Sequence, residues 1–117
     1  MEKDPAVYIA HVLEAISNIE ADILGLDFDA FRHDRRARQL VERNLEMISE
    51  ASRRPPGPLK QQEPQIPWRA IAGIGNILRH EYHHTYPTVL WDTCKKDLLP
   101  LKEAMIRIES RVRESTS

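Results

Sequence analysis

The sequence lacks the features that mark secreted, membrane-spanning or strand-rich proteins. Its one cysteine, Cys94, cannot form a disulfide within the chain, and no charged-then-apolar leader opens it, so we expect a reducing, cytoplasmic location. No apolar run approaches the roughly 18 residues that a membrane helix needs, which argues against a membrane span. No stretch sustains a strand-like alternation of apolar and polar residues, which argues against a sheet.

Length and composition favour one folded domain over residues 1–117. Hydrophobic residues make up 41% and charged residues 30% of the chain, a balance typical of folded domains rather than disordered segments. The formal net charge is only -1, so any affinity for nucleic acid has to come from a local patch. Residues 1–30 carry a charge of -6, whereas residues 31–54 carry +3. This uneven distribution favours association of oppositely charged surfaces, or a basic groove on a neutral body.

Apolar residues recur at intervals of three and four along most of the chain, the spacing that places them on one face of a helix. The pattern predicts an all-α antiparallel bundle of about four to five helices. The predicted helices run from Pro5 to about Gly25, from Asp27 or Asp29 to about Arg53, from Pro67 through Tyr82, from about Thr88 to Lys96, and from Leu98 onward. Trp68, Trp91 and Cys94 are expected in or against the core.

A proline-rich segment, residues 54–67, separates the second and third predicted helices. It holds five of the eight prolines, which predicts a loop with extended, stiffened stretches. Connections in helical bundles commonly have about 2–8 residues, and longer ones are often mobile or functional. The sequence does not decide between these two possibilities.

The candidate catalytic residues lie between Gly73 and His84, where two motifs overlap. His80-Glu81-Tyr82-His83-His84 fits the pattern H-E-x-x-H, in which two histidines one turn apart bind zinc and the glutamate acts as general base. No further histidine follows, although Asp92 could supply a third ligand. A histidine-rich helix end readily produces such a match by accident. A zinc hydrolase is therefore only the third hypothesis, and we expect no metal site.

The second motif begins with Asn76 and His80, which are four residues apart and share a helix face. Here the sequence resembles the HepT-type toxins of the HEPN superfamily, over nearly the whole chain. The resemblance rests on Arg43-Asn-Leu-Glu-Met-Ile-Ser-Glu-Ala51, Ile66-Pro-Trp-Arg69, Gly75-Asn-Ile-Leu-Arg-His-Glu-Tyr82, Val89-Leu-Trp-Asp92 and Asp97-Leu-Leu-Pro-Leu101, in this order. It implies an all-α HEPN bundle that pairs as a homodimer and cleaves RNA in the shared cleft, without a metal or other cofactor.

The resemblance also implies a partner and a form of regulation. In type VII toxin–antitoxin systems of this kind, an MntA-like nucleotidyltransferase antitoxin inactivates the toxin by attaching AMP to the motif tyrosine. The motif is an arginine, four residues, a histidine, one residue and the tyrosine. On this pattern His80 is the motif histidine, Asn76 the polar residue after the arginine, and Tyr82 the modified tyrosine. Gly75 stands in place of the arginine, and Ser49 in place of a glycine usual in the family.

The glycine at position 75 bears directly on the expected chemistry. Attack of a ribose 2′-hydroxyl on its phosphate needs a group of near-neutral pKa to move protons, which His80 supplies. It also needs a fixed cation for the charge that builds on phosphorus, and Gly75 offers none. Glycine also costs a helix about 1 kcal/mol relative to alanine.

Arg79 could replace the missing cation. It follows Gly75 by one turn, and helical side chains lean toward the N-terminus, so its guanidinium could reach the space over residue 75. That Arg79 is an ordinary exposed arginine is equally open. The sequence thus predicts a ribonuclease, impaired at Gly75, in which His80 is the acid and base, Asn76 orients phosphate and Arg79 is the cation. The alternative is a catalytically inactive binding module that dimerises and engages the nucleotidyltransferase.

Overall fold

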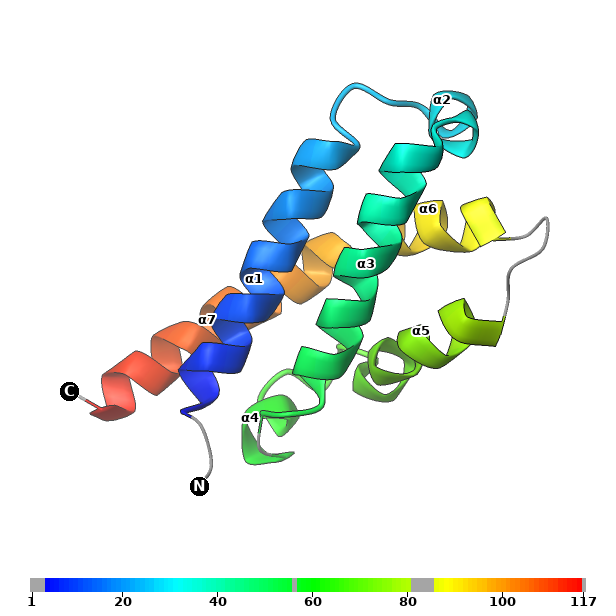
Figure 1. The fold of residues 1–117 in the computed structure, drawn as a ribbon. Helices are drawn as coiled ribbons and strands as arrows, with labels where there is room; N and C mark the ends of the chain where they lie inside the picture. Colours follow the sequence, from blue (N-terminus) through cyan, green and yellow to red (C-terminus); the bar gives the residue numbers. More distant parts are fainter. Residues whose placement is uncertain (1–3, 56, 81–85, 117) are drawn as a thin grey trace.

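The computed structural model describes residues 4–55, 57–80 and 86–116, and all regular secondary structure within these ranges is helical (Figure 1). The described residues form seven helices: α1 (Pro5–Asp22), α2 (Phe28–His33), α3 (Arg35–Ser52), α4 (Gly57–Gln61), α5 (Trp68–His80), α6 (Tyr86–Lys96) and α7 (Leu98–Thr116). Five of them have 11 residues or more, and each of these overlaps one of the five predicted helices. The predicted all-α class is confirmed.

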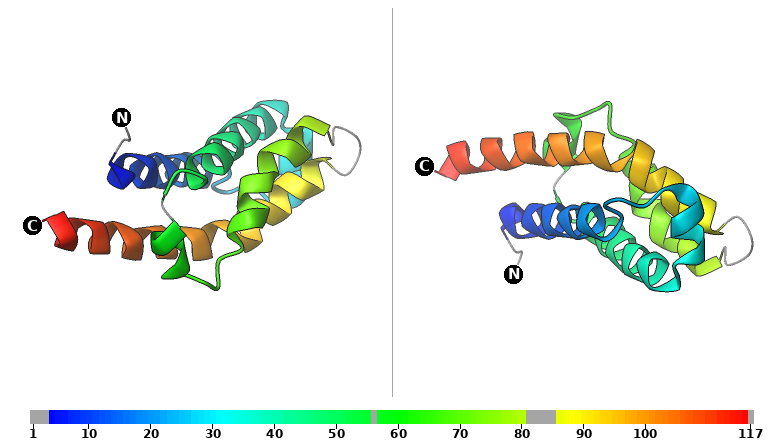
Figure 2. Two further views of the ribbon diagram at one scale, coloured as in Figure 1. Left: turned by 90° about the horizontal axis from the view of Figure 1, so that it is seen from below. Right: turned by 90° about the horizontal axis from the view of Figure 1, so that it is seen from above.

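Helix α3 occupies the centre of the arrangement. α1 and α3 run antiparallel and side by side, and α5 lies along the other flank of α3 (Figure 1). In the views from below and above, α1 and α3 form one layer, and α7 lies across from α1 in a second layer that α6 leads into (Figure 2). Because α3 contacts both α1 and α5, it fixes where the motif helix sits.

The predicted apolar stripes form the core. Ile9, Val12, Ile16 and Ile19 of α1 are fully buried, and so are Val41, Leu45 and Ile48 of α3 and Met105 and Ile108 of α7. Burial of these side chains supplies the main force that holds the layers together, at about 1.5–3 kcal/mol for each large aliphatic residue. None of the described helices combines the length and apolarity that a bilayer crossing demands.

The three residues expected at the core lie there or against it. Cys94 is buried, and loss of hydration raises the pKa of its thiol to about 12. Trp68 and Trp91 are partly buried and pack against the core. The Trp91 ring lies 5.1 Å from the Phe31 ring between centroids, and Lys95 Nζ lies 4.7 Å from the Trp91 ring centroid.

The second predicted helix is in fact two helices, α2 and α3, which is a correction. Asp34 has extended backbone angles between them, and its carboxylate accepts the N–H of Ala37 at 3.0 Å, capping α3. Asp27, one of the two predicted caps, accepts the N–H of Ala30 at 2.8 Å and begins α2. Asp27 and Asp34 therefore each cap a helix, and the predicted single helix is divided into α2 and α3 at Asp34.

The proline-rich segment is partly helical and is tied to its surroundings, where a plain loop was expected. It contains the short helix α4. The indole N–H of Trp68, at the start of α5, donates to the carbonyl oxygens of Lys60 and Glu63, each at 3.1 Å. The segment thus folds back on the helix that it precedes.

Glu63 anchors this segment to α7. Its side chain is only 3% exposed, and its carboxylate accepts from Arg107 Nη2 at 2.7 Å, Arg111 Nη1 at 2.8 Å and Gln65 Nε2 at 2.8 Å. The hydrogen bond from Arg107 is the main reason why the pKa of Glu63 falls to about 2, against the opposing effect of burial. A buried carboxylate with three donors fixes the lead-in to α5 on α7.

Candidate functional site

The motif positions Gly75, Asn76 and His80 lie on helix α5, which α3 covers on one side. Ile71, Gly75 and Leu78 are buried and lie on the inner face, whereas Asn76 and Ile77 are exposed. The helix begins directly after Pro67, where the missing N–H of proline costs nothing. The exposed amide of Asn76 is thus available to a ligand on the outer surface of α5.

The structure describes the backbone, but not the side chains, of Arg79 and His80, which complete the last turn of α5. Tyr82 and the remaining zinc-motif residues, Glu81, His83 and His84, lie outside the described residues. The structure therefore brings Gly75, Asn76 and the backbone of His80 onto one helix, with His80 one turn beyond Asn76. Among the residues it describes, no group of three His, Cys, Asp or Glu side chains could hold a metal ion.

Gly75, at the position of the missing arginine, lies against α3. Its N–H donates to Ser49 Oγ at 3.2 Å, and the Ser49 hydroxyl donates to the carbonyl oxygen of Ala72 at 2.7 Å. Arg53 Nη2 donates to the same carbonyl at 2.6 Å. The Ser49 side chain is 2% exposed and its bond to the Gly75 N–H is buried, whereas Arg53 reaches the Ala72 carbonyl from an exposed position. Position 75 is thus a point of close contact between helices.

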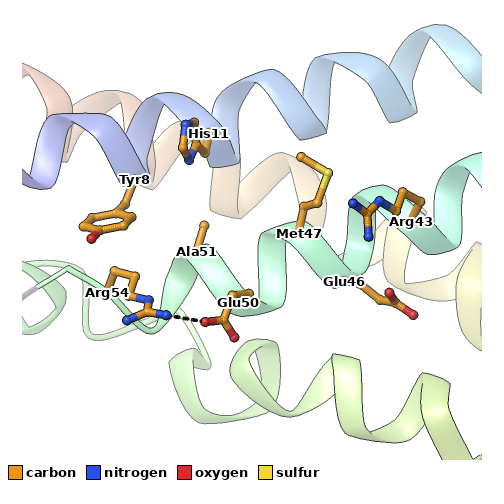
Figure 3. Close-up of a pocket in the computed structure, with 8 residues that line it drawn as sticks. All are labelled: Tyr8, His11, Arg43, Glu46, Met47, Glu50, Ala51 and Arg54. Carbon is orange, nitrogen blue, oxygen red and sulfur yellow. Dashed lines mark hydrogen bonds and ion pairs between the residues drawn. The ribbon is translucent and has the colours of Figure 1, made fainter. Parts of the chain in front are cut away.

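A groove of about 680 Å³ opens on the face formed by α1 and α3 (Figure 3). Tyr8 and His11 line it from α1, and Met47 points across it from α3 (Figure 3). The other wall carries charges of both signs, among them Arg43 and Glu50. The groove therefore combines an apolar centre with a mixed-charge rim.

Sequence reasoning did not single out this groove, although α3 carries a signal for it. Leu40 and Met47, seven residues apart, are 41% and 40% exposed on a helix whose other outward residues are largely polar, and Met47 lines the groove. Apolar side chains at this spacing share a helix face and commonly mark a contact surface. The signal becomes specific only once α1 and α3 are known to lie side by side.

Comparison with known proteins decides the family. The model of the family described as ribonuclease HepT-like matches residues 12–108. The chain belongs to the HepT-like ribonuclease family. It is similar to a "Probable ribonuclease HepT" from Thermococcus cleftensis, at 36% identity over 102 residues, which cover 87% of this chain and 93% of the relative. The predicted resemblance to HepT-type proteins of the HEPN superfamily is confirmed.

A second relative of this HepT-like chain comes from Caldanaerobacter subterraneus subsp. tengcongensis and is named "Putative RNase TTE0752". It is 28% identical over 106 residues, which cover 91% of this chain and 95% of the relative. No solved structure matches the chain. The matched region contains both α3 and α5, so the family assignment covers the motif helix and the helix that holds it.

Proposed function

We propose that this HepT-like protein is an RNase-type HEPN toxin that cleaves RNA by transesterification without a metal. The family match over residues 12–108 carries the proposal. The exposure of Asn76 on α5, one turn before His80, supports it, because a phosphate on the outer face of α5 could be reached from both positions. The named relatives are ribonucleases by name, in agreement with this activity.

The proposed reaction needs only side chains of this chain. His80 takes the proton of the ribose 2′-hydroxyl, whose oxygen attacks the neighbouring phosphorus. The bond from phosphorus to the 5′-oxygen breaks, the leaving oxygen receives a proton from an imidazolium, and a 2′,3′-cyclic phosphate remains. Asn76 orients the phosphate, and Arg79 supplies the cation that Gly75 cannot provide.

Cleavage of a labelled single-stranded RNA by the purified protein tests this function. The wild type should cleave, His80→Ala should lose the activity, and Asn76→Ala should reduce it by about tenfold to a thousandfold. His33→Ala removes a histidine that is exposed on α2, far along the chain from the motif, and should leave the rate unchanged. Equal rates for the wild type and His80→Ala would reject the assignment of the acid and base.

Regulation by a nucleotidyltransferase antitoxin is part of the same proposal. The phenol oxygen of Tyr82 would attack the α-phosphate of ATP, with pyrophosphate leaving and AMP remaining on the tyrosine. Incubation with an MntA-like enzyme and ATP should add the mass of one adenylate group, which Tyr82→Phe should prevent and Tyr8→Phe should not. A modified Tyr82→Phe variant would place the acceptor elsewhere.

We also propose a homodimer in which the groove between α1 and α3 meets a second copy. Arg43 and Glu50 lie on opposite sides of Met47 along α3. An antiparallel approach of two α3 helices about an axis near Met47 would set Arg43 of one copy opposite Glu50 of the other. Such self-complementary charge around an apolar centre suits an interface between identical chains.

Sedimentation of the intact protein tests the dimer and its location. Met47→Lys should shift the population toward the monomer, and so should Arg43→Glu alone. The pair Arg43→Glu with Glu50→Arg restores opposite charges across the proposed axis and should restore the dimer. A monomeric wild type, or a dimer unaffected by any of these changes, would refute this interface.

The alternative function is a binding module that dimerises and engages the nucleotidyltransferase without cleaving RNA. The glycine at position 75 favours this alternative, because glycine supplies no cation where the family motif has an arginine. Expression without the partner separates the two functions. Growth arrest that His80→Ala abolishes supports the nuclease, whereas harmless expression of the wild type supports the module.

A further inference from the structure

The Ser49 hydroxyl of α3 is hydrogen-bonded to α5, the helix that carries the motif positions. It donates to the carbonyl oxygen of Ala72 and accepts the N–H of Gly75, so both of its contacts fall within one turn of α5. Serine is usually exposed, yet this side chain is 2% exposed and forms its hydrogen bonds entirely across a helix boundary. The arrangement differs from the usual helix contact, in which apolar side chains interlock.

The contacted turn leads directly to the candidate site. In a regular α-helix the carbonyl of residue 72 accepts the N–H of residue 76, and Gly75 immediately precedes Asn76. Arg53, one turn beyond Ser49 on α3, also donates to the Ala72 carbonyl. Three donor–acceptor contacts from α3 therefore converge on the backbone that carries Asn76 and continues to His80.

We propose that Ser49 is a positioning residue for the motif helix. Apolar contacts hold α5 against α3 but leave small rotations and slides of low cost, because dispersion forces depend weakly on direction. Two hydrogen bonds from one buried hydroxyl depend on both distance and angle, and they fix the height and rotation of α5 at residues 72–75. Ser49 thereby sets the direction in which Asn76 and residue 80 face the bound phosphate.

Ser52 provides a matched control within the same helix. Its side chain is 1% exposed, and its hydroxyl donates to the carbonyl oxygen of Ser49 at 2.9 Å, within α3. Ser52→Ala and Ser49→Ala therefore remove the same group from equally buried sites, but only the second removes a contact with α5. A general effect of deleting a buried hydroxyl should appear in both variants to a similar degree.

The experiment compares the two variants by amide hydrogen exchange and by RNA cleavage. Ser49→Ala should speed exchange at the Gly75 amide by about tenfold, while Ser52→Ala should leave it unchanged. The cleavage part rests on the proposed function: Ser49→Ala should lower kcat by about tenfold to a hundredfold with KM unchanged, because a misplaced group affects the reaction more than binding. Ser52→Ala should retain the wild-type kcat.

The two readouts separate failure of the positioning role from failure of the nuclease. Equal exchange at Gly75 in both variants, or equal kcat values at similar thermal stability, would overturn the role of Ser49. A wild type that does not cleave RNA would refute the proposed function, and the exchange comparison would still decide whether Ser49 holds α5. A higher KM in Ser49→Ala, with kcat unchanged, would also count against the positioning role, because it would mean that only binding is affected.

Discussion

Helix α5 is held by two polar contacts that differ in kind. Its lead-in is fixed by an ionic cluster, in which buried Glu63 accepts from Arg107 and Arg111 of α7. Its middle is fixed by an uncharged contact, in which Ser49 bonds to the α5 backbone near Gly75. The ionic cluster holds the segment that precedes α5, whereas the Ser49 contact is made with the backbone of the motif helix itself. The Ser49 hydroxyl itself carries no charge, although the guanidinium of Arg53 donates to the same Ala72 carbonyl from an exposed position.

The largest expected effect comes from placing a side chain in the neutral contact. Gly75→Arg would put a long charged group at a buried position whose backbone nitrogen lies 3.2 Å from Ser49 Oγ. We expect a loss of about 2–4 kcal/mol in the free energy of unfolding, because the charge must be buried or the helices must separate. Urea denaturation of the variant and the wild type measures this difference in the free energy of unfolding.

Gly73 is the matched control for this change. It lies on the same helix, and a Cβ there would meet no atom within 4 Å. Gly73→Arg should therefore change the free energy of unfolding by less than about 1 kcal/mol. Equal losses for the two variants would show that position 75 is not a point of close contact.

Breaking the ionic contact should have the next largest effect. Glu63→Gln keeps the shape of the side chain but removes the charge that the two arginines share, and we expect a loss of about 1–3 kcal/mol. Glu50→Gln, in an exposed pair with Arg54 at 2.6 Å, should cost less than about 1 kcal/mol. Chemical denaturation of both variants at neutral pH checks the difference. If Glu63→Gln proved the milder change, burial would not be what strengthens the cluster.

The pH dependence should separate the two contacts. The pKa of Glu63 is about 2 in the folded protein against an ordinary value of 4.5, so the folded chain binds this proton more weakly than the unfolded chain. The stability from Glu63 is therefore fully present above pH 4.5 and is lost as the pH falls toward 2. The stability gap between the wild type and Glu63→Gln should narrow over this range. The gap to Ser49→Ala should stay constant, because serine does not titrate there.

The smallest expected effect on stability comes from a substitution at Gly73, where an added Cβ would meet no other atom within 4 Å. Gly73→Ala should raise the free energy of unfolding by about 0.5–1 kcal/mol, because alanine favours the helix and meets open space. Thermal unfolding detects this as a small rise in Tm. A fall in Tm would mean that the outer face of α5 is more crowded than its contacts indicate.

The helices were predictable because each apolar stripe is a local pattern of three- and four-residue steps. The break at Asp34 was not, since Asp27, Asp29 and Asp34 are all acceptable caps in an otherwise continuous helical run. The anchoring of the proline-rich segment depends on Arg107, 44 residues beyond Glu63 in the sequence. No local pattern joins such distant positions.

In the candidate site, too, some features were predictable from the local sequence and others depend on contacts between distant residues. Asn76 and the place of His80 on one helix followed from their spacing and from the resemblance to the family. The contact between Ser49 and Gly75 did not, because it requires knowing that α3 covers α5 and which face of α5 it covers. Side-chain chemistry at 80 and 82 remains a prediction from the motif.

The proposal that residues on α5 make this protein a metal-independent ribonuclease is tested by the chemical ends of its RNA products. An RNA with one susceptible linkage, incubated with the protein and excess chelator, should yield 2′,3′-cyclic phosphate ends. The same RNA with a 2′-deoxy sugar at that linkage should stay intact, and His80→Ala should cleave neither. Cleavage of the 2′-deoxy RNA, or an activity that the chelator abolishes, would show that the protein does not use metal-independent transesterification.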